Sequence, residues 1–208
     1  MVTSLPSPLS RQPATATATA TAPRSPDQRS SATQASRTSV LVLPGRGEES
    51  TVFDDLAFRL ALDGHAVRVA GPHETATSIG EARIPDAPFV VLGSDTGALR
   101  ALTAAASPAL RPDGLVLFGL PLLYRRSAGR PLAEPPPHAL PDLPILLVHG
   151  SGDEISPLSL VRPTAQVARR ADLVVVAGGH QIVTGPGRHF ATASTLVFLE
   201  TLVLSRSA

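Results

Sequence analysis

Three acidic or imidazole side chains stand directly after short apolar runs of the sequence, where they could do chemistry together. Carboxylates and imidazoles are the groups that proteins use as nucleophiles and as general acids and bases. Their order along the chain is a carboxylate, a second carboxylate and then a histidine, so that one acid could attack a substrate while the other orients the imidazole. These residues are Asp95 after the run 88–93, Asp153 after the run 144–150, and His180 after the run 171–178.

The first of these carboxylates, Asp95, lies between two glycines at the spacing small-x-Asp-x-small. A tight turn from a strand into a helix needs small residues at both flanking positions, here Gly93 and Gly97, because bulkier side chains would collide with the neighbouring backbone. Such a turn presents the central side chain at the N-terminus of the helix, where a negative charge is favoured. Ser94 is one position out of this register, since the residue two before it is Leu92. The pattern therefore predicts Asp95 as the nucleophile.

The elements that would position these side chains are six short apolar runs, separated by stretches with helical spacing. The runs are rich in Val, Leu and Ile and are bounded by Gly or Pro, as expected for strands that are covered on both faces. This alternation predicts an α/β fold, with a mostly parallel sheet of about six strands and helices on both faces. In such a sheet, ligands bind at the carboxyl ends of the strands. The predicted strands are 39–43, 65–70, 88–93, 114–119, 144–150 and 171–178.

Four helices are predicted between and after these strands. Ser50 or Thr51 is expected to cap the first helix, which ends before Gly64. Pro163 is expected in the first turn of the third helix, because proline suits that position. The segment 119–144 contains three consecutive prolines and is predicted to be a loop. The second and the last helix are predicted over 96–106 and 190–204.

The composition excludes several kinds of chemistry. All 18 basic side chains are Arg, so no Lys is available for a Schiff base or for a phosphate-binding loop. The absence of Cys excludes disulfides, thiolate metal sites and a cysteine nucleophile. A net charge of +1 favours neither a nucleic acid nor an anionic membrane as a partner. We expect a small-molecule substrate and no metal or organic cofactor.

Residues 1–38 differ from the rest of the chain. They are rich in Ala, Thr, Ser and Pro, nearly free of large apolar residues, and contain one acid, Asp27. Such a segment buries too little apolar surface to offset the entropy of ordering, so we predict a disordered low-complexity tail followed by one domain over 39–208. No apolar stretch has the length of a secretory signal or of a membrane span, and we expect a cytoplasmic protein.

Taken together, four short motifs in this order resemble those of the α/β-hydrolase superfamily, over residues 39–204. The segment VLGSDTGA looks like the nucleophile elbow, HGSGDEISP like the loop that carries the acid, AGGHQI like the histidine loop, and LPGRG like the oxyanion loop. The resemblance implies a hydrolase with a triad of Asp95, His180 and Asp153. It also implies oxyanion donors from backbone N–H groups, one of Thr96 and one near Arg46.

The departure from the family pattern is the nucleophile, because most members carry Ser where this chain has Asp95. A minority of the superfamily, resembling epoxide hydrolases and haloalkane dehalogenases, uses Asp to form an alkyl ester that water then hydrolyses. Dehalogenases of this kind hold the halide with Trp, which this chain lacks, and the epoxide hydrolases use a pair of cap-domain tyrosines, whereas Tyr124 is the only Tyr. The segment 119–144 is also too short for a cap domain.

Two carboxylates beside one imidazole have an electrostatic consequence. If Asp95 and Asp153 both contact His180, they favour the imidazolium ion and raise the pKa of His180. A protonated histidine cannot act as a general base, but this conflict ends once Asp95 is esterified and loses its charge. We therefore expect covalent catalysis through Asp95 and poor activity on ordinary esters.

Less specific interpretations compete with a catalytic site. Asp95 could simply cap its helix. The chain could also be a catalytically inactive relative that keeps the scaffold as a binding or regulatory module. A third interpretation takes residues 45–50, GRGEES, as a dinucleotide-binding fingerprint, although Ser50 replaces the third glycine and no acid ends the second strand.

Other polar residues carry weaker signals. Arg46 could bind an anionic group of the substrate, but a solvated loop arginine is the favoured interpretation. His149 is expected to be structural, and His138 and His189 are expected on the surface. Arg125, Arg126 and Arg130 form a basic cluster in the Pro-rich loop, where they are expected to be solvated or to screen substrates.

Overall fold

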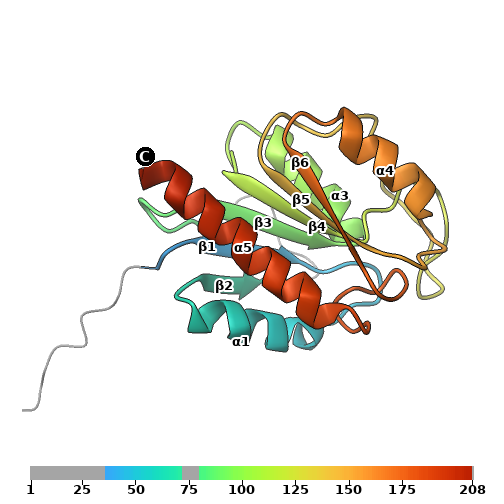
Figure 1. Cartoon of the computed structure of the whole chain (residues 1–208), viewed down its shortest axis with the longest axis horizontal. Helices are drawn as coiled ribbons and strands as arrows, with labels where there is room; N and C mark the ends of the chain where they lie inside the picture. Colours follow the sequence, from blue (N-terminus) through green and yellow to red (C-terminus); the bar gives the residue numbers. More distant parts are fainter. Residues whose placement is uncertain (1–35, 72–79, 208) are drawn as a thin grey trace, which may run out of the picture. The chain divides into compact units, whose positions relative to one another are not determined.

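The computed structural model describes residues 36–71 and 80–207, and all structural statements refer to these residues (Figure 1). The predicted tail, residues 1–38, lies outside this part of the chain except for its last three residues. The backbone N–H of Arg37 donates to the carbonyl oxygen of Gly64, and the Arg37 side chain pairs with Glu200. Thr38 is buried, and its Oγ1 lies 2.8 Å from Nδ1 of His65. The chain is thus attached to the domain from Arg37 onward.

One parallel sheet of six strands forms the centre of the domain (Figure 1). Its strand order is β2-β1-β3-β4-β5-β6, and each strand pairs in parallel with its neighbours. The predicted α/β class and the six predicted strands are confirmed, with ends that differ by no more than two residues. The strands are β1 (Ser39–Leu43), β2 (Ala66–Val69), β3 (Phe89–Ser94), β4 (Gly114–Phe118), β5 (Ile145–Gly150) and β6 (Ala171–Val176).

Helices cover both faces of this sheet (Figure 1). Helices α1 and α5 lie on one face, and α3 and α4 lie on the other. No helix within residues 36–71 and 80–207 is both long and apolar enough to span a bilayer. The helices are η1 (Ser50–Phe53, a 3₁₀ turn), α1 (Asp54–Leu62), α3 (Thr96–Ala106), α4 (Leu158–Val167) and α5 (Arg188–Ser207).

The alternation of side chains along the strands explains this two-faced core. In β1, Leu41 and Leu43 point toward the cluster that contains α3, whereas Val40 and Val42 point toward the cluster that contains α1 and α5. Every residue of β1, β3, β4 and β5 is buried. Strands buried on both faces have continuous apolar sequences, and this is the pattern from which the fold was predicted.

Two predicted helix starts are wrong. Pro163 is the sixth residue of α4, which begins at Leu158, because Val161 and Ala165 are buried and their packing offsets the hydrogen bond that proline lacks. Neither Ser50 nor Thr51 caps α1. The chain enters α1 through the 3₁₀ turn η1, whose N-cap residue Glu49 makes no side-chain capping bond. The segment between β4 and β5 contains no named helix or strand, as predicted for 119–144.

Candidate active site

Asp95 lies in the sharp turn between β3 and α3, at the carboxyl end of the sheet. Its backbone has φ 49° and ψ −119°, a conformation that is strained for any residue other than glycine. A Cβ atom on Gly97 would lie 1.8 Å from the carbonyl oxygen of Leu43, and one on Gly93 would lie 2.2 Å from that of Gly97. The two glycines therefore allow the close packing that forces Asp95 into this turn, as predicted from their spacing.

The structure brings Asp95, His180 and Asp153 together, although they are far apart in sequence. The Nε2 atom of His180 lies 3.0 Å from Oδ1 of Asp95, and its Nδ1 atom lies 2.8 Å from Oδ2 of Asp153. Oδ1 of Asp153 accepts hydrogen bonds from the backbone N–H groups of Ile155 and Ser156, at 2.8 and 2.9 Å. The acid loop thus holds the Asp153 carboxylate, and this carboxylate holds the imidazole between the two acids.

Arg46 closes the other side of the Asp95 carboxylate. Its Nε atom donates to Oδ2 at 2.7 Å and its Nη2 atom donates to Oδ1 at 2.6 Å, which forms a bidentate salt bridge. The Nη1 atom donates to the carbonyl oxygens of Arg125 and Arg130. Because Arg46 is only 8% exposed, the favoured prediction of a solvated loop arginine is wrong. The reason is its buried partner, which the sequence places 49 residues away.

The loop after β1 also contacts Asp95 through its backbone. The N–H of Arg46 donates to Oδ2 of Asp95 at 3.0 Å, so one of the two predicted oxyanion donors already binds this carboxylate. Thr96 is buried and is the first residue of α3, so its N–H has no acceptor within the helix. Both predicted donors therefore belong to residues that lie next to Asp95.

Four buried charges form a continuous chain from Arg46 through Asp95 and His180 to Asp153. Burial alone would raise the pKa of Asp95, but the hydrogen bonds from Arg46 and His180 outweigh it and lower this pKa far below its usual value. Burial likewise opposes the charge on His180, yet its bonds to Asp153 and Asp95 raise the pKa of His180 to about 9. The imidazole ring of His180 is thus charged at neutral pH, as we expected for a ring that contacts two carboxylates.

We expect an NMR titration of the His180 ring nitrogens to show a pKa of about 9. Because the folded-state pKa lies above the ordinary value of 6.5, the stabilisation due to the charged ring is complete below pH 6.5 and disappears as the pH rises through about 9. Chemical unfolding at fixed temperature should therefore show a fall in the free energy of unfolding over that interval. In Asp95→Asn the same resonance should titrate at lower pH, because one carboxylate is lost. A pKa of His180 near 6.5 in the parent protein would contradict the hydrogen bonds between this ring and the two carboxylates.

Two further polar residues lie at the site: Glu48, which carried no clear signal in the sequence, and His149, which was expected to be structural. Glu48 accepts hydrogen bonds from the N–H of Gly45 at 2.7 Å and from Oγ of Ser94 at 2.8 Å, so it connects the loop after β1 to β3. Burial raises the pKa of this Glu48 carboxyl group. His149 is buried, as expected for a structural residue, and its Nε2 atom lies 3.3 Å from Oδ2 of Asp153.

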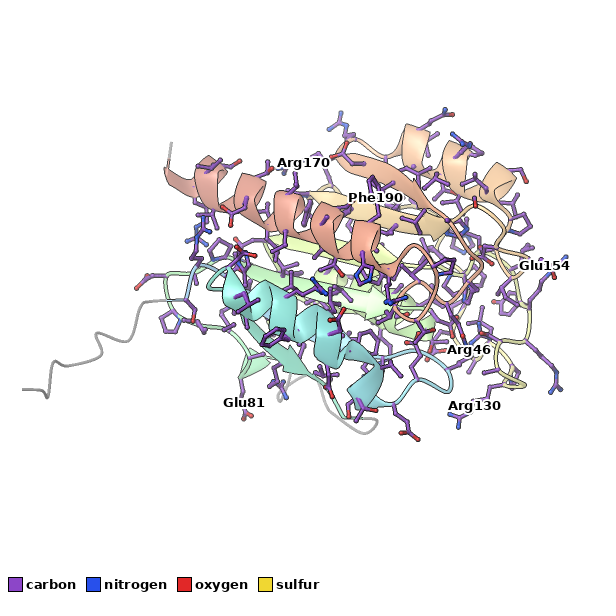
Figure 2. All side chains as sticks on the ribbon, turned by 60° about the horizontal axis from the view of Figure 1, so that its bottom comes forward. Arg46, Glu81, Arg130, Glu154, Arg170 and Phe190 are labelled. Carbon is purple, nitrogen blue, oxygen red and sulfur yellow. The ribbon has the colours of Figure 1, made fainter. Side chains whose placement is uncertain are left out.

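The remaining predicted residues lie outside this network. His138 and His189 are exposed, as predicted. The side chains of Arg125, Arg126 and Arg130 are also exposed. In Figure 2, Arg130 lies at the same end of the domain as Arg46. The predicted cluster therefore contributes to the site through the backbone carbonyls of Arg125 and Arg130 that bind Arg46.

A cavity of about 880 Å³ opens beside the loop after β1, and Arg46 is among the residues that line it. It is lined by the loop residues 44–50, by Thr96, and by the side chains of Arg100, Arg130 and Glu134, among others. Asp95 and His180 are not part of its lining. Arg46 thus contacts both this cavity and the Asp95 carboxylate.

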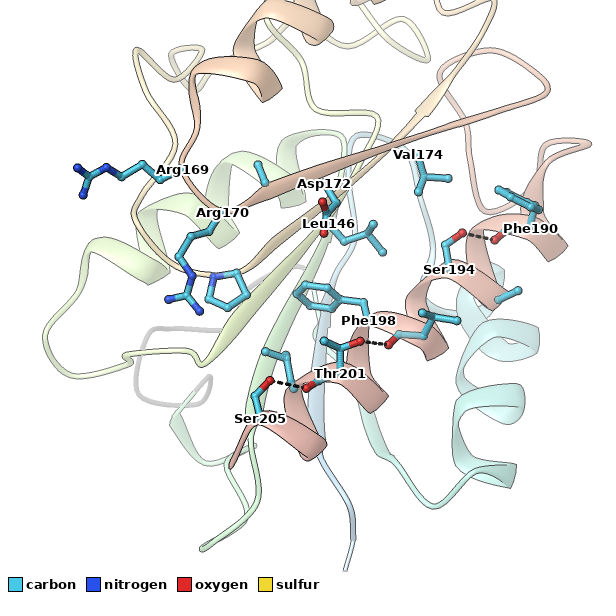
Figure 3. A pocket seen from close by; sticks show the side chains of 15 residues that line it. Leu146, Arg169, Arg170, Asp172, Val174, Phe190, Ser194, Phe198, Thr201 and Ser205 are labelled. Atoms are coloured by element: carbon cyan, nitrogen blue, oxygen red, sulfur yellow. Dashed lines mark hydrogen bonds between the residues drawn. The ribbon is translucent and has the colours of Figure 1, made fainter. Parts of the chain in front are cut away.

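A second cavity, of about 650 Å³, lies between α5 and β6 (Figure 3). The hydroxyl groups of Ser194, Thr201 and Ser205 on its wall donate to backbone carbonyls of their own helix (Figure 3). No member of the Asp95, His180 and Asp153 network lines this groove, whereas Arg46 and Thr96, which adjoin Asp95, line the first cavity. Within the described residues no cluster of three or more His, Cys, Asp or Glu side chains could hold a metal ion.

The domain has the same fold as several solved hydrolases, to which it is only distantly similar in sequence. A lipase in its open form superposes with a TM-score of 0.65 and 17% identity, over 81% of this chain and 91% of the lipase. The thioesterase RedJ of prodiginine biosynthesis in Streptomyces coelicolor gives 0.63 and 17%, over 80% and 87% of the two chains. Est1E from Butyrivibrio proteoclasticus gives 0.64 and 14%, over 82% and 90%. No protein-family model and no curated protein sequence matches this chain.

Proposed function

We propose that this protein is a hydrolase of small molecules in which Asp95 is the nucleophile, His180 activates water and Asp153 orients His180. The observation that carries the proposal is the position of the His180 ring, with Nε2 at 3.0 Å from Asp95 and Nδ1 at 2.8 Å from Asp153. The α/β-hydrolase fold and the strained turn at Asp95 support the same assignment. The cavity of about 880 Å³ has a size suited to a small molecule.

The first step would be a displacement at carbon. Oδ1 of Asp95 attacks an electrophilic sp³ carbon of the substrate, and the leaving group departs with the electron pair of the broken bond. The product is a neutral ester of Asp95. His180 then faces one carboxylate, Asp153, in place of two, so its pKa falls and the ring can lose its proton.

The second step would be hydrolysis of this ester. Water attacks the carboxyl carbon of Asp95 and gives its proton to Nε2 of His180, while the N–H groups of Arg46 and Thr96 stabilise the oxyanion. Collapse of the intermediate releases the alcohol, which takes the proton from His180 and keeps the oxygen that attacked. The water oxygen stays in the Asp95 carboxylate. The overall reaction consumes one substrate and one water, and yields an alcohol, the leaving group and a proton.

Isotope labelling tests this mechanism directly. A single turnover of a panel of neutral and anionic alkyl bromides in H₂¹⁸O should place heavy oxygen in the peptide that contains Asp95, as measured by mass spectrometry. His180→Gln should instead accumulate the alkyl ester on Asp95, because no base activates water. The absence of both label and ester with every substrate of the panel would exclude Asp95 as a nucleophile.

The bidentate Arg46–Asp95 pair favours a second candidate, a catalytically inactive binding or regulatory protein. Both oxygens of Asp95 already accept hydrogen bonds from Arg46, which a purely structural ion pair would also show. In that case the parent would form no ester but would still bind ligands in the cavity. A dinucleotide-binding function ranks third, because the N–H of Arg46 donates to Asp95 and is not free for a pyrophosphate.

A further inference from the structure

The attacking oxygen of Asp95 is blocked in this structure. Oδ1 accepts a hydrogen bond from Nη2 of Arg46 at 2.6 Å and also lies 3.0 Å from Nε2 of His180. Oδ2 accepts hydrogen bonds from the Nε atom and from the backbone N–H of Arg46. Because the cavity is lined by Arg46 and not by Asp95, a substrate that enters it contacts Arg46 and has no direct access to the carboxylate. The reaction therefore requires Arg46 to release Asp95.

The nature of the entering group decides how readily this release occurs. A buried guanidinium that loses its carboxylate keeps its charge, and an unpaired buried charge is strongly unfavourable. A neutral substrate offers no replacement partner. A substrate with a carboxylate or a similar anion can accept the same forked pair of N–H groups, so that one bidentate ion pair replaces another.

The walls of the cavity are compatible with such an anion. Arg100 and Arg130 line it, and neither guanidinium group has an ion-pair partner in the described part of the chain. Their charges offset those of Glu49 and Glu134, which also line the cavity. The remaining carboxylate, Glu48, is bound to Gly45 and Ser94. The three arginines and three glutamates of the lining balance, and Arg46 is the arginine whose guanidinium group binds Asp95.

From this geometry we infer that Arg46 is a latch that exchanges Asp95 for an anionic group of the substrate, so that the enzyme acts on anionic electrophiles. The inference rests on the proposed function, in which Asp95 is the attacking group. With bromoacetate, the carboxylate would pair with Arg46, Oδ1 of Asp95 would form a C–O bond, and the C–Br bond would break with release of bromide. Hydrolysis of the ester by water then yields glycolate and a proton.

Two alkylating reagents of the same size test the latch. Bromoacetate is anionic and bromoacetamide is neutral, and the absence of Cys removes the residue that both would otherwise modify first. The rate of Asp95 modification is measured by mass spectrometry in His180→Gln, where the ester persists. Each rate is divided by the rate of the same reagent with free acetate. We expect bromoacetate to be favoured by at least about tenfold, which corresponds to one strong ion pair.

Variants of Arg46 should change this selectivity. Arg46→Met frees Oδ1 and removes the anion partner, so bromoacetamide should react faster and the preference for bromoacetate should disappear. Arg46→Lys keeps the positive charge but cannot form a bidentate pair, so it should lower the preference for bromoacetate. It provides a second test if Arg46→Met does not fold. The matched control is Arg126→Met, because this exposed arginine bonds only to the carbonyl of Gly129 and does not line the cavity. It should keep the full preference.

The outcomes separate the latch from the proposed function. If Asp95 reacts equally with both reagents, or if the Arg46 variants keep the preference, the latch is wrong and the nucleophile stands. If neither reagent modifies Asp95 in any variant, the nucleophile is wrong, and NMR titrations of the parent decide the latch. Acetate, but not acetamide, should then shift the His180 ring signals in the parent and leave them unchanged in Arg46→Met. The absence of an acetate effect would overturn the inference.

Discussion

Replacing Asp95 by Ser should give the protein an esterase activity that the parent lacks. The substitution puts a hydroxyl at the strained turn, next to Nε2 of His180, which remains bound to Asp153. Loss of the Asp95 charge lowers the pKa of His180, so the neutral ring can accept the serine proton. The N–H of Arg46, which donates to Asp95 in the parent, becomes free to stabilise an oxyanion. We expect kcat/KM for 4-nitrophenyl acetate to rise at least about 100-fold over the parent.

Two variants control this result. Asp95→Asn also removes the charge but supplies no nucleophile, so it should stay as inactive on the ester as the parent. Combining Asp95→Ser with His180→Gln should abolish the new activity, because the serine then has no base. If Asp95→Ser folds and binds a nitrophenyl ester without hydrolysing it, the site lacks a working oxyanion hole. That result would favour the inactive binding protein.

The fold was predictable because its strands are buried on both faces. The run Phe89–Ser94 is entirely buried, and such a strand needs apolar residues at every position, which makes it visible without knowledge of its neighbours. The order of the motifs then placed Asp95, Asp153 and His180 at one edge, since parallel strands share the direction of their carboxyl ends. Local turn chemistry and strand direction were enough for these three residues.

Arg46 was misjudged because its role depends on tertiary structure alone. Nothing near it in sequence distinguishes it from an exposed arginine between two glycines, and its partners are Asp95 and the carbonyls of Arg125 and Arg130. The helix α4 was misplaced for a related reason. Local propensity puts Pro163 at a helix start, whereas the burial of Val161 and Ala165 on the sheet extends the helix to Leu158. In both cases distant contacts outweigh local preference.

The Arg46–Asp95 pair should also contribute strongly to the stability of the fold. Removing one partner of a buried ion pair leaves the other charge with fewer partners, and after Arg46→Met the Asp95 carboxylate keeps only His180 as an ion-pair partner. This variant should therefore lower the free energy of unfolding by about 3 kcal/mol, measured by urea denaturation at pH 7. Asp95→Asn should cost a similar amount, since it leaves Arg46 with carbonyl partners only. In the double variant Arg46→Met with Asp95→Asn neither charge is stranded, and the loss should be much smaller than the sum of the two.

The pair between Asp55 and Arg59 provides the matched control for this cycle. It joins the same types of side chain on α1, but both are about half exposed, so Arg59→Met should cost less than about 1 kcal/mol. If Arg46→Met is as harmless as Arg59→Met, the buried pair is weak, and a neutral substrate could then open it. A large coupling energy would instead mean that only a group of comparable charge can replace Asp95 at Arg46. The stability of this pair therefore decides which electrophiles can reach the nucleophile.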